Sequence, residues 1–309
     1  MTTGTPPPIA VQPDGPRNFL RPAVEAGGAR IVEPGEAEAL VWTAPADSDG
    51  LAAVLDAHAN IRWVQLPWAG VEPYVEVIRA HAERTWTCGK GVYAEPVAEH
   101  ALALALAGRR RIDRFARAGR WGRAQGENLL GARVTILGGG GITTSLLRML
   151  GPFDCDITVV RRNPEPMAGV ARVVADDEVD KALTGADVVV LALALTPDTE
   201  GVIDARRLAL LARGATLVNV ARGRHVVTDD LVAALRDGTL GSAGLDVTDP
   251  EPLPDDHPLW SLPNAVVTPH TANTPEMAIP LLSARVTDNI RRWTAGEPLL
   301  GPLDPEAGY

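Results

Sequence analysis

The chain has 309 residues, enough for about two domains with sizeable hydrophobic cores. Its 46% hydrophobic and 22% charged residues are ordinary for a globular protein, and its net charge of −10 argues against a general nucleic-acid binder, which needs a basic face. The two cysteines, Cys88 and Cys155, stand in no metal-binding or redox spacing, so no metal site and a reducing compartment are expected.

Short β-branched runs alternate with helical patterns along the chain, which is typical of parallel sheets covered by helices. In the first third, strands are expected at 9–11, 29–32, 39–42 and 61–66, and helices near 49–58 and 73–83. An Ala/Leu-rich helix then runs from Glu95 to about Arg117. The three arginines at 109–111 are interpreted as a solvated helix end that the helix dipole favours.

A second α/β unit begins with a strand at 133–137. Further strands are expected near 156–160, 187–193, 215–220, 242–247 and 265–268, followed by a helix at about 276–295. That helix allows the chain to return to the first unit.

A glycine-rich turn follows the strand at 133–137, where Gly138-Gly139-Gly140-Gly141 leads into a helical pattern. Strand, tight turn and helix are the context that a dinucleotide-binding turn requires. Gly138 would make the turn, and Gly140 would let the backbone approach a pyrophosphate at the helix N-terminus. Thr143 replaces the third glycine of that fingerprint, and a purely structural turn is the alternative.

The next strand ends in two arginines, Arg161 and Arg162. A site selective for NAD generally has an acid there, which holds the ribose hydroxyls and repels a 2′-phosphate. Arginines attract that phosphate, so the pair predicts a preference for NADP, with NAD possible. The alternative is a solvated basic loop that tolerates NAD.

Arg222, Glu251 and His270 each follow an apolar, strand-like run. Side chains at the carboxyl ends of parallel strands meet in one crevice. Arginine grips a carboxylate with two parallel hydrogen bonds, histidine moves a proton near neutrality, and glutamate can orient the histidine. Each residue alone could be a surface or turn residue, but together they predict an enzyme acting on a small 2-oxo or 2-hydroxy acid.

The motifs, taken in order, resemble the D-isomer-specific 2-hydroxyacid dehydrogenase family. The resemblance is carried by VAEH at 97–100, LTPDT at 195–199, NVARG at 219–223, GLDV at 244–247, EP at 251–252, PLW at 258–260 and TPH at 268–270. The first 90 residues match loosely, chiefly at QLPWAGV, 65–71.

The resemblance implies a role for each matching residue. Arg222 would bind the substrate carboxylate and carbonyl oxygen, His270 would be the acid/base, and Glu251 would hold His270 in the right tautomer. The implied cofactor contacts are the amides of Gly141 and Ile142 on the pyrophosphate, Asp246 on the nicotinamide carboxamide, the Ala221 backbone beside it, and Thr196 in the LTPDT segment. The amides of Ala69 and Gly70 would hold the carboxylate. His100, His225 and His257 are interpreted as packing or surface residues.

The expected fold is therefore α/β, with two Rossmann-like or flavodoxin-like lobes, doubly wound parallel sheets and a cleft between them. Residues 1–94 plus 276–309 would form the substrate domain and 95–275 the dinucleotide-binding domain. We expect an oxidoreductase that transfers a hydride between NADP(H) and a small acid such as glyoxylate or hydroxypyruvate. The alternative is a nucleotide-sensing binding protein of the corepressor type.

The resemblance also implies a homodimer. The start of the chain lacks the positive charge and apolar run of a signal peptide, and no segment approaches the roughly 18 apolar residues of a membrane span. We therefore expect a cytoplasmic location, with neither membrane nor nucleic acid as a partner.

Overall fold

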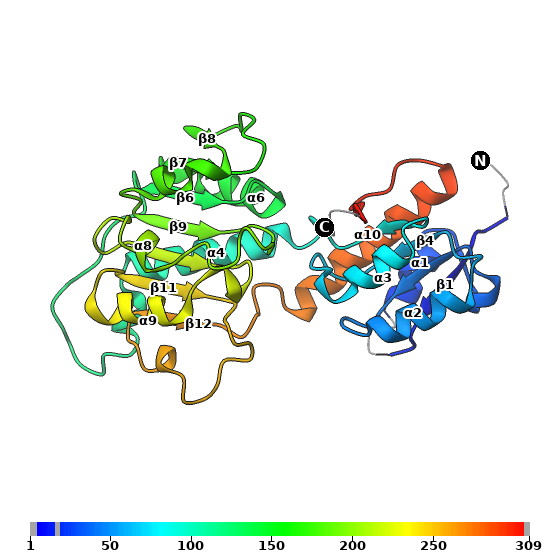
Figure 1. The fold of residues 1–309 in the computed structure, drawn as a ribbon, viewed down its shortest axis with the longest axis horizontal. Helices are drawn as coiled ribbons and strands as arrows, with labels where there is room; N and C mark the ends of the chain where they lie inside the picture. Colours follow the sequence, from blue (N-terminus) through cyan, green and yellow to red (C-terminus); the bar gives the residue numbers. More distant parts are fainter. Residues whose placement is uncertain (1–4, 16–18, 306–309) are drawn as a thin grey trace. The chain divides into compact units, whose positions relative to one another are not determined.

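The computed structural model describes residues 5–15 and 19–305, and the chain divides into two compact units (Figure 1). Unit 1 comprises 1–93 and 274–309, and unit 2 comprises 94–273. Each unit is built on one parallel sheet with helices packed against it, so the expected α/β fold with two parallel sheets is confirmed.

Unit 1 contains a five-stranded parallel sheet in the order β2-β1-β3-β4-β5, which is the flavodoxin-like order. The strands are β1 (Pro8–Gln12), β2 (Arg30–Ile31), β3 (Ala39–Trp42), β4 (Trp63–Gln65) and β5 (Thr85–Thr87). The helices are α1 (Leu20–Ala26), α2 (Ser48–Ala57), α3 (Val75–Ala80) and α10 (Pro275–Ala295). Strand β5, which has only three residues, was not predicted from the sequence.

Alternation along the strands divides the apolar side chains of unit 1 between the two faces of the sheet. Ile9 and Val11 pack with residues of α1 and α10, whereas Ala10 packs with residues of α2 and α3. Helix α10 belongs to unit 1, where Thr287 donates a hydrogen bond to the Ala23 carbonyl on α1.

Unit 2 contains a seven-stranded parallel sheet in the order β12-β11-β10-β9-β6-β7-β8. Counted from β6, this is the Rossmann order 3-2-1-4-5-6 with one more strand. The strands are β6 (Arg133–Leu137), β7 (Asp156–Val160), β8 (Arg172–Val174), β9 (Val188–Leu191), β10 (Thr216–Asn219), β11 (Ser242–Leu245) and β12 (Ala265–Val267). The helices are α4 (Ala94–Arg109), α5 (Ile112–Phe115), α6 (Gly141–Leu150), α7 (Val179–Leu183), α8 (Ala205–Leu208) and α9 (Thr228–Asp237).

The strands of unit 2 are apolar on both faces, as expected for a sheet covered on both sides. Val188 and Val190 of β9 pack with the core that includes α4 and α6 residues. Val189 and Leu191 pack with the core that includes α7, α8 and α9 residues. The continuous apolar run of this strand therefore reflects burial from both sides.

The helix expected from Glu95 to about Arg117 is interrupted at Arg111, whose φ of 55° is left-handed. The interpretation of 109–111 as a solvated helix end is wrong for Arg109, which is 6% exposed. Arg109 pairs with Glu127 at 2.6 Å and donates to the Asn128 carbonyl, and Arg111 donates to the Gly214 carbonyl. These arginines tie the end of α4 to neighbouring loops.

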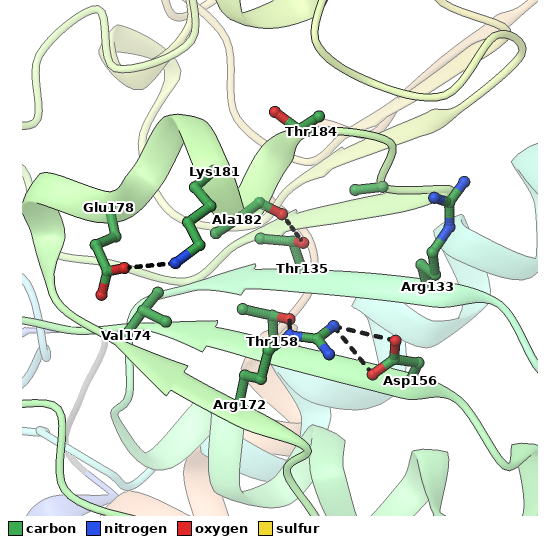
Figure 2. A pocket seen from close by; sticks show the side chains of 11 residues that line it. Arg133, Thr135, Asp156, Thr158, Arg172, Val174, Glu178, Lys181, Ala182 and Thr184 are labelled. Carbon is green, nitrogen blue, oxygen red and sulfur yellow. Dashed lines mark hydrogen bonds and ion pairs between the residues drawn. The ribbon is translucent and has the colours of Figure 1, made fainter.

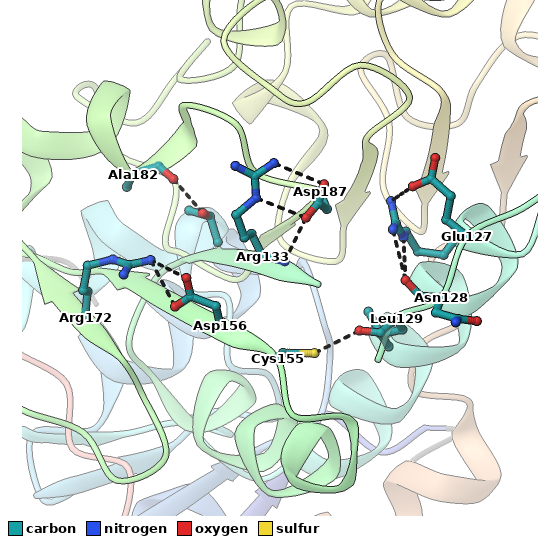
Figure 3. A network of polar contacts seen from close by, with 11 residues as sticks. Glu127, Asn128, Leu129, Arg133, Cys155, Asp156, Arg172, Ala182 and Asp187 are labelled. Atoms are coloured by element: carbon teal, nitrogen blue, oxygen red, sulfur yellow. Dashed lines mark hydrogen bonds and ion pairs between the residues drawn. The ribbon is translucent and has the colours of Figure 1, made fainter. Parts of the chain in front are cut away.

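Charged side chains also gather at the amino-terminal edge of this sheet (Figure 3). Arg133 at the start of β6 pairs with Asp187, 3.3 Å from Nε to Oδ2. Arg172 at the start of β8 donates to both carboxylate oxygens of Asp156 at 3.1 and 3.0 Å. Exposed ion pairs of this kind contribute about 0–1 kcal/mol each, so they do not dominate the stability of the sheet.

A cavity of about 110 Å³ lies between the same edge and α7 (Figure 2). Two buried hydroxyls face it: Thr135 donates to the Ala182 carbonyl, and Thr158 accepts from Arg172. These two hydroxyls are therefore hydrogen-bonded within the chain. In the part of the chain that the structure describes, no helix is both long and apolar enough to cross a bilayer.

Candidate active site

The candidate residues of unit 2 lie beyond the carboxyl ends of its strands. Arg222 follows β10, Glu251 follows β11 and His270 follows β12, and these three strands are neighbours in the sheet. The strand order reverses between β6 and β9, where an open α/β sheet has its ligand crevice. The glycine turn follows β6, so this edge of the sheet also carries the expected cofactor turn.

Glu251 and His270 form a hydrogen-bonded pair. The distance from His270 Nδ1 to Glu251 Oε1 is 2.7 Å, and the two side chains are 54% and 41% exposed. When Nδ1–H donates to the carboxylate, Nε2 is the nitrogen left to exchange a proton with a ligand.

Asp246 holds the turn that carries His270. His270 has a φ of 49°, a left-handed conformation that is strained in a residue with a side chain. Its amide donates to the Asp246 carbonyl at 2.9 Å, and the amides of Thr271 and Ala272 donate to the Asp246 carboxylate at 2.9 and 3.0 Å. Asp246 is 2% exposed, so these bonds lie in the interior and fix the orientation of the catalytic candidate.

His100 approaches the same turn from α4. Its Nε2 lies 3.0 Å from Thr268 Oγ1, which donates to Asp246 Oδ1 at 2.5 Å. The interpretation of His100 as an ordinary packing residue therefore missed a contact with the loop that precedes His270. The Asp246 carboxylate thus accepts three hydrogen bonds from its own chain, from Thr268, Thr271 and Ala272. Its expected contact with a nicotinamide carboxamide stays a prediction.

The Arg222 loop is held by hydrogen bonds from two of its own side chains, Asn219 and Arg222. Asn219 accepts from the Ala221 amide at 3.0 Å and donates to the Arg222 carbonyl at 2.9 Å. The Arg222 guanidinium donates to the Ala221 carbonyl at 2.8 Å. A Cβ on Gly223 would lie 1.9 Å from the Thr248 carbonyl oxygen, so only glycine allows this loop to approach the loop after β11 so closely.

The glycine turn has the backbone of a dinucleotide-binding turn. Gly138 has a φ of +108°, and a Cβ there would lie 2.2 Å from the Ala192 carbonyl oxygen. A Cβ on Gly140, in contrast, would meet no described atom within 4 Å. Packing within the described chain therefore requires glycine at 138 but not at 140. The sequence predicted glycine at 140 for another reason, the close approach of a pyrophosphate to the backbone.

Thr143 explains how the turn tolerates the loss of the third glycine. The side chain is 0% exposed, and its hydroxyl donates to the Gly138 carbonyl at 2.7 Å. The threonine thus reinforces the turn. Helix α6 begins at Gly141 with no acidic residue in its first turn, so its amides and dipole favour an anion, and the residues present fit the pyrophosphate of a dinucleotide.

Arg161 lies directly behind this turn. A Cβ on Gly139 would lie 2.7 Å from Cδ of Arg161, so the arginine side chain occupies the space that a side chain at 139 would need. Arg161 follows the last residue of β7, the position at which the ribose of a dinucleotide is recognised. Arg162 beside it is exposed.

The remaining expected residues lie in two loops. Thr196 is in the turn after β9, where its amide donates to the Thr199 hydroxyl at 2.8 Å. Ala69 and Gly70 are in the loop after β4 of unit 1, and neither amide donates a hydrogen bond within the described residues. Their binding to the substrate carboxylate stays a prediction. Within 5–15 and 19–305, no group of three or more His, Cys, Asp or Glu side chains could hold a metal ion.

Comparison with known proteins shows the family. Residues 100–272 match the family model described as "D-isomer specific 2-hydroxyacid dehydrogenase, NAD binding domain", which is more than half of the chain. The chain belongs to this family. It is an NAD(P)-dependent oxidoreductase that acts on a 2-oxo or D-2-hydroxy acid, and the alternative of a non-enzymatic nucleotide sensor is not favoured.

Similar proteins cover more than four-fifths of the chain. A Corynebacterium melassecola protein described as "Uncharacterized protein in proB 3'region" is 40% identical over 260 residues, 82% of this chain and 86% of that protein. Glyoxylate/hydroxypyruvate reductase A of Serratia proteamaculans is 31% identical over 285 residues, 88% and 87% of the two chains. A D-isomer specific 2-hydroxyacid dehydrogenase from Xanthobacter autotrophicus Py2, solved in complex with NADPH and MES, has 29% identity and a TM-score of 0.83 and covers 99% and 100%.

Proposed function

We propose that this family member is an NADPH-preferring reductase of small 2-oxo acids such as glyoxylate or hydroxypyruvate. The observation that carries the proposal is the hydrogen bond between His270 Nδ1 and Glu251 Oε1, 2.7 Å long, which joins the loops after β12 and β11. These two strands lie next to the β10 of Arg222 in the order β12-β11-β10. The similarity to glyoxylate/hydroxypyruvate reductase A supports this substrate class. The NADPH bound to the Xanthobacter autotrophicus relative supports the cofactor.

The proposed cofactor site is the turn after β6 together with Arg161. The turn at Gly138 and Gly140 and the amides of Gly141 and Ile142 would hold the pyrophosphate. Arg161 and Arg162 would attract the 2′-phosphate of NADP by charge-assisted hydrogen bonds. The Ala221 backbone and Asp246 stay predictions as contacts of the nicotinamide half, and Thr196 stays a prediction as a contact of the cofactor. Bound NADPH would supply the hydride.

The proposed chemistry of the chain itself is charge stabilisation and proton transfer. As the carbonyl carbon of the acid is reduced, negative charge develops on its oxygen. The Arg222 guanidinium and protonated His270 stabilise that charge, and His270 Nε2 then gives its proton to the oxygen. Glu251 keeps the ring in the required tautomer through Nδ1. The amides of Ala69 and Gly70 are proposed as donors to the substrate carboxylate.

A panel of 2-oxo acids tests the substrate class. Each acid is incubated with enzyme and NADPH, and loss of NADPH absorbance is followed, with NADH in parallel. The proposal predicts turnover of glyoxylate and hydroxypyruvate and a higher kcat/KM with NADPH than with NADH. Turnover only of bulky 2-oxo acids would contradict the substrate class, and a strong preference for NADH would contradict the cofactor.

We further propose a homodimer formed through unit 2 and a location in the cytoplasm. Trp121 is fully exposed and Leu130 is 59% exposed, on a segment of unit 2 without helix or strand. Large exposed apolar side chains favour burial against a second protein surface. Light scattering of the purified protein measures the oligomeric state, and a monomer at micromolar concentration would contradict the dimer.

A further inference from the structure

His225 is buried directly beside Arg222. It ends the short 3₁₀ turn Gly223–His225 that follows Arg222, and it is 0% exposed. The sequence interpretation treated it as a packing or surface residue, because nothing in its local pattern distinguishes it. A fully buried imidazole is costly unless its nitrogens are hydrogen-bonded, so its partners indicate why it is there.

The ring of His225 contacts two separate loops. Its Nδ1 lies 3.2 Å from the Arg222 amide and 3.0 Å from the Arg222 carbonyl oxygen. Its Nε2 lies 3.3 Å from the Ala194 carbonyl oxygen. When Nδ1 accepts from the Arg222 amide, Nε2 carries the proton and donates it to Ala194. One side chain therefore connects the backbone of Arg222 to the loop after β9.

The Ala194 carbonyl also accepts a hydrogen bond within the segment that is expected to contact the cofactor. It accepts a hydrogen bond from the Thr199 hydroxyl at 2.8 Å, and that hydroxyl accepts one from the Thr196 amide at 2.8 Å. The backbone reinforces this connection, because the amide of Ile203 donates to the His225 carbonyl at 2.9 Å. Side-chain and backbone hydrogen bonds therefore join the 222–225 turn to the 194–203 segment.

We infer that His225 is a positioning residue, which fixes the backbone of Arg222 and couples it to the cofactor loop at Ala194. The inference rests on the proposed role of Arg222 in binding the substrate carboxylate. A guanidinium that makes two parallel hydrogen bonds must be held in one plane, and a displacement of about 1 Å can cost about 100-fold in rate. His225 provides that support from the interior and does not touch the substrate.

Two substitutions separate the two contacts. In His225→Asn, the amide oxygen is as many bonds from Cα as Nδ1 is, so it retains an acceptor for the Arg222 amide but does not reach Ala194. In His225→Gln, the amide nitrogen matches Nε2, so it retains the donor to Ala194 and loses the acceptor. His225→Leu removes both contacts.

The measurements are KM for glyoxylate, Kd for NADPH, and Tm. His225→Gln is expected to raise KM about five- to 100-fold with a near-normal Kd, the range for one lost buried hydrogen bond. His225→Asn is expected to keep KM within about threefold and to raise Kd, and His225→Leu to raise both. The pH profile of kcat is expected to keep its wild-type midpoint in all three, because His270 is untouched.

His257→Gln is the matched control. The His257 ring also accepts a hydrogen bond from a backbone amide, that of Leu259 at 3.3 Å. This bond caps a different 3₁₀ turn, Pro258–Trp260. It is expected to keep wild-type KM and Kd. If His225→Leu lowers Tm but leaves KM and Kd unchanged, or if the Asn and Gln variants shift KM and Kd alike, the inference is wrong. If wild-type enzyme reduces no acid, the proposed function fails, and the NADPH Kd of the Asn and Gln variants still decides whether His225 acts on the cofactor loop.

Discussion

The substitution Gly140→Ala tests whether this glycine is needed for the stability of the fold or for binding of the cofactor. Gly140 has φ −88° and ψ −163°, extended backbone that alanine adopts without strain. The added methyl group would meet no described atom within 4 Å. Replacing glycine by alanine at such a position stabilises by about 0.4–1 kcal/mol through the unfolded chain. Alanine is a poorer N-cap than glycine by a similar amount. The free energy of unfolding of the apo protein should therefore change by less than about 1 kcal/mol.

The affinity for NADPH should fall steeply. The methyl group would stand where the pyrophosphate approaches the backbone, and a hydrogen bond to a charged group is worth about 1.5–3 kcal/mol. Loss of one such bond raises Kd about 10- to 150-fold. Titration of tryptophan fluorescence with NADPH measures Kd, and thermal unfolding of the apo protein measures stability.

Gly151→Ala at the other end of α6 is the control. Its Cβ would also meet no described atom within 4 Å, and its backbone is ordinary right-handed helix. This variant should bind NADPH as the wild type does. Normal NADPH affinity in Gly140→Ala would refute the placement of the pyrophosphate, and a loss of more than about 2 kcal/mol of apo stability would show that the glycine serves the fold.

Arg222→Ala should raise KM for the acid at least about 100-fold with little change in Kd for NADPH, because two charge-assisted hydrogen bonds are lost; unchanged KM would contradict its role. Arg161→Ala should lower kcat/KM about 10- to 100-fold with NADPH and less than about threefold with NADH; equal losses would contradict recognition of the 2′-phosphate. Burial raises the pKa of the Cys88 and Cys155 thiols, so less thiolate forms near pH 8 and Ellman's reagent should react slowly until the protein unfolds; two fast-reacting thiols in the folded enzyme would contradict this.

Features set by local pattern were predictable from the sequence. The strand 133–137 is bounded as expected, because an apolar β-branched run before glycines has few alternatives. Arg222, Glu251 and His270 lie at strand ends because short turn-forming segments follow these strands. The glycine turn was recognisable because its neighbours in the chain are also its neighbours in space.

Features set by distant contacts were not predictable. Arg109 looks like a solvated helix end until Glu127 and the Asn128 carbonyl are brought to it by the fold. His225 follows Arg222 by three residues, but its second partner, Ala194, is 31 positions away. The hydrogen bonds of Asp246 to the turn at 270–272 likewise depend on the pairing of β11 with β12. Such contacts leave no periodic signal in the sequence.

The most direct test of the central claim is NADPH oxidation by wild-type enzyme and His270→Ala, assayed side by side with glyoxylate. The wild type is expected to consume one NADPH for each hydroxy acid formed. The His270→Ala variant is expected to be slower by about 10²–10⁴ while binding NADPH normally, because a positioned proton donor is lost. No consumption of NADPH by the wild type with glyoxylate or hydroxypyruvate, or equal rates in the two enzymes, would contradict it.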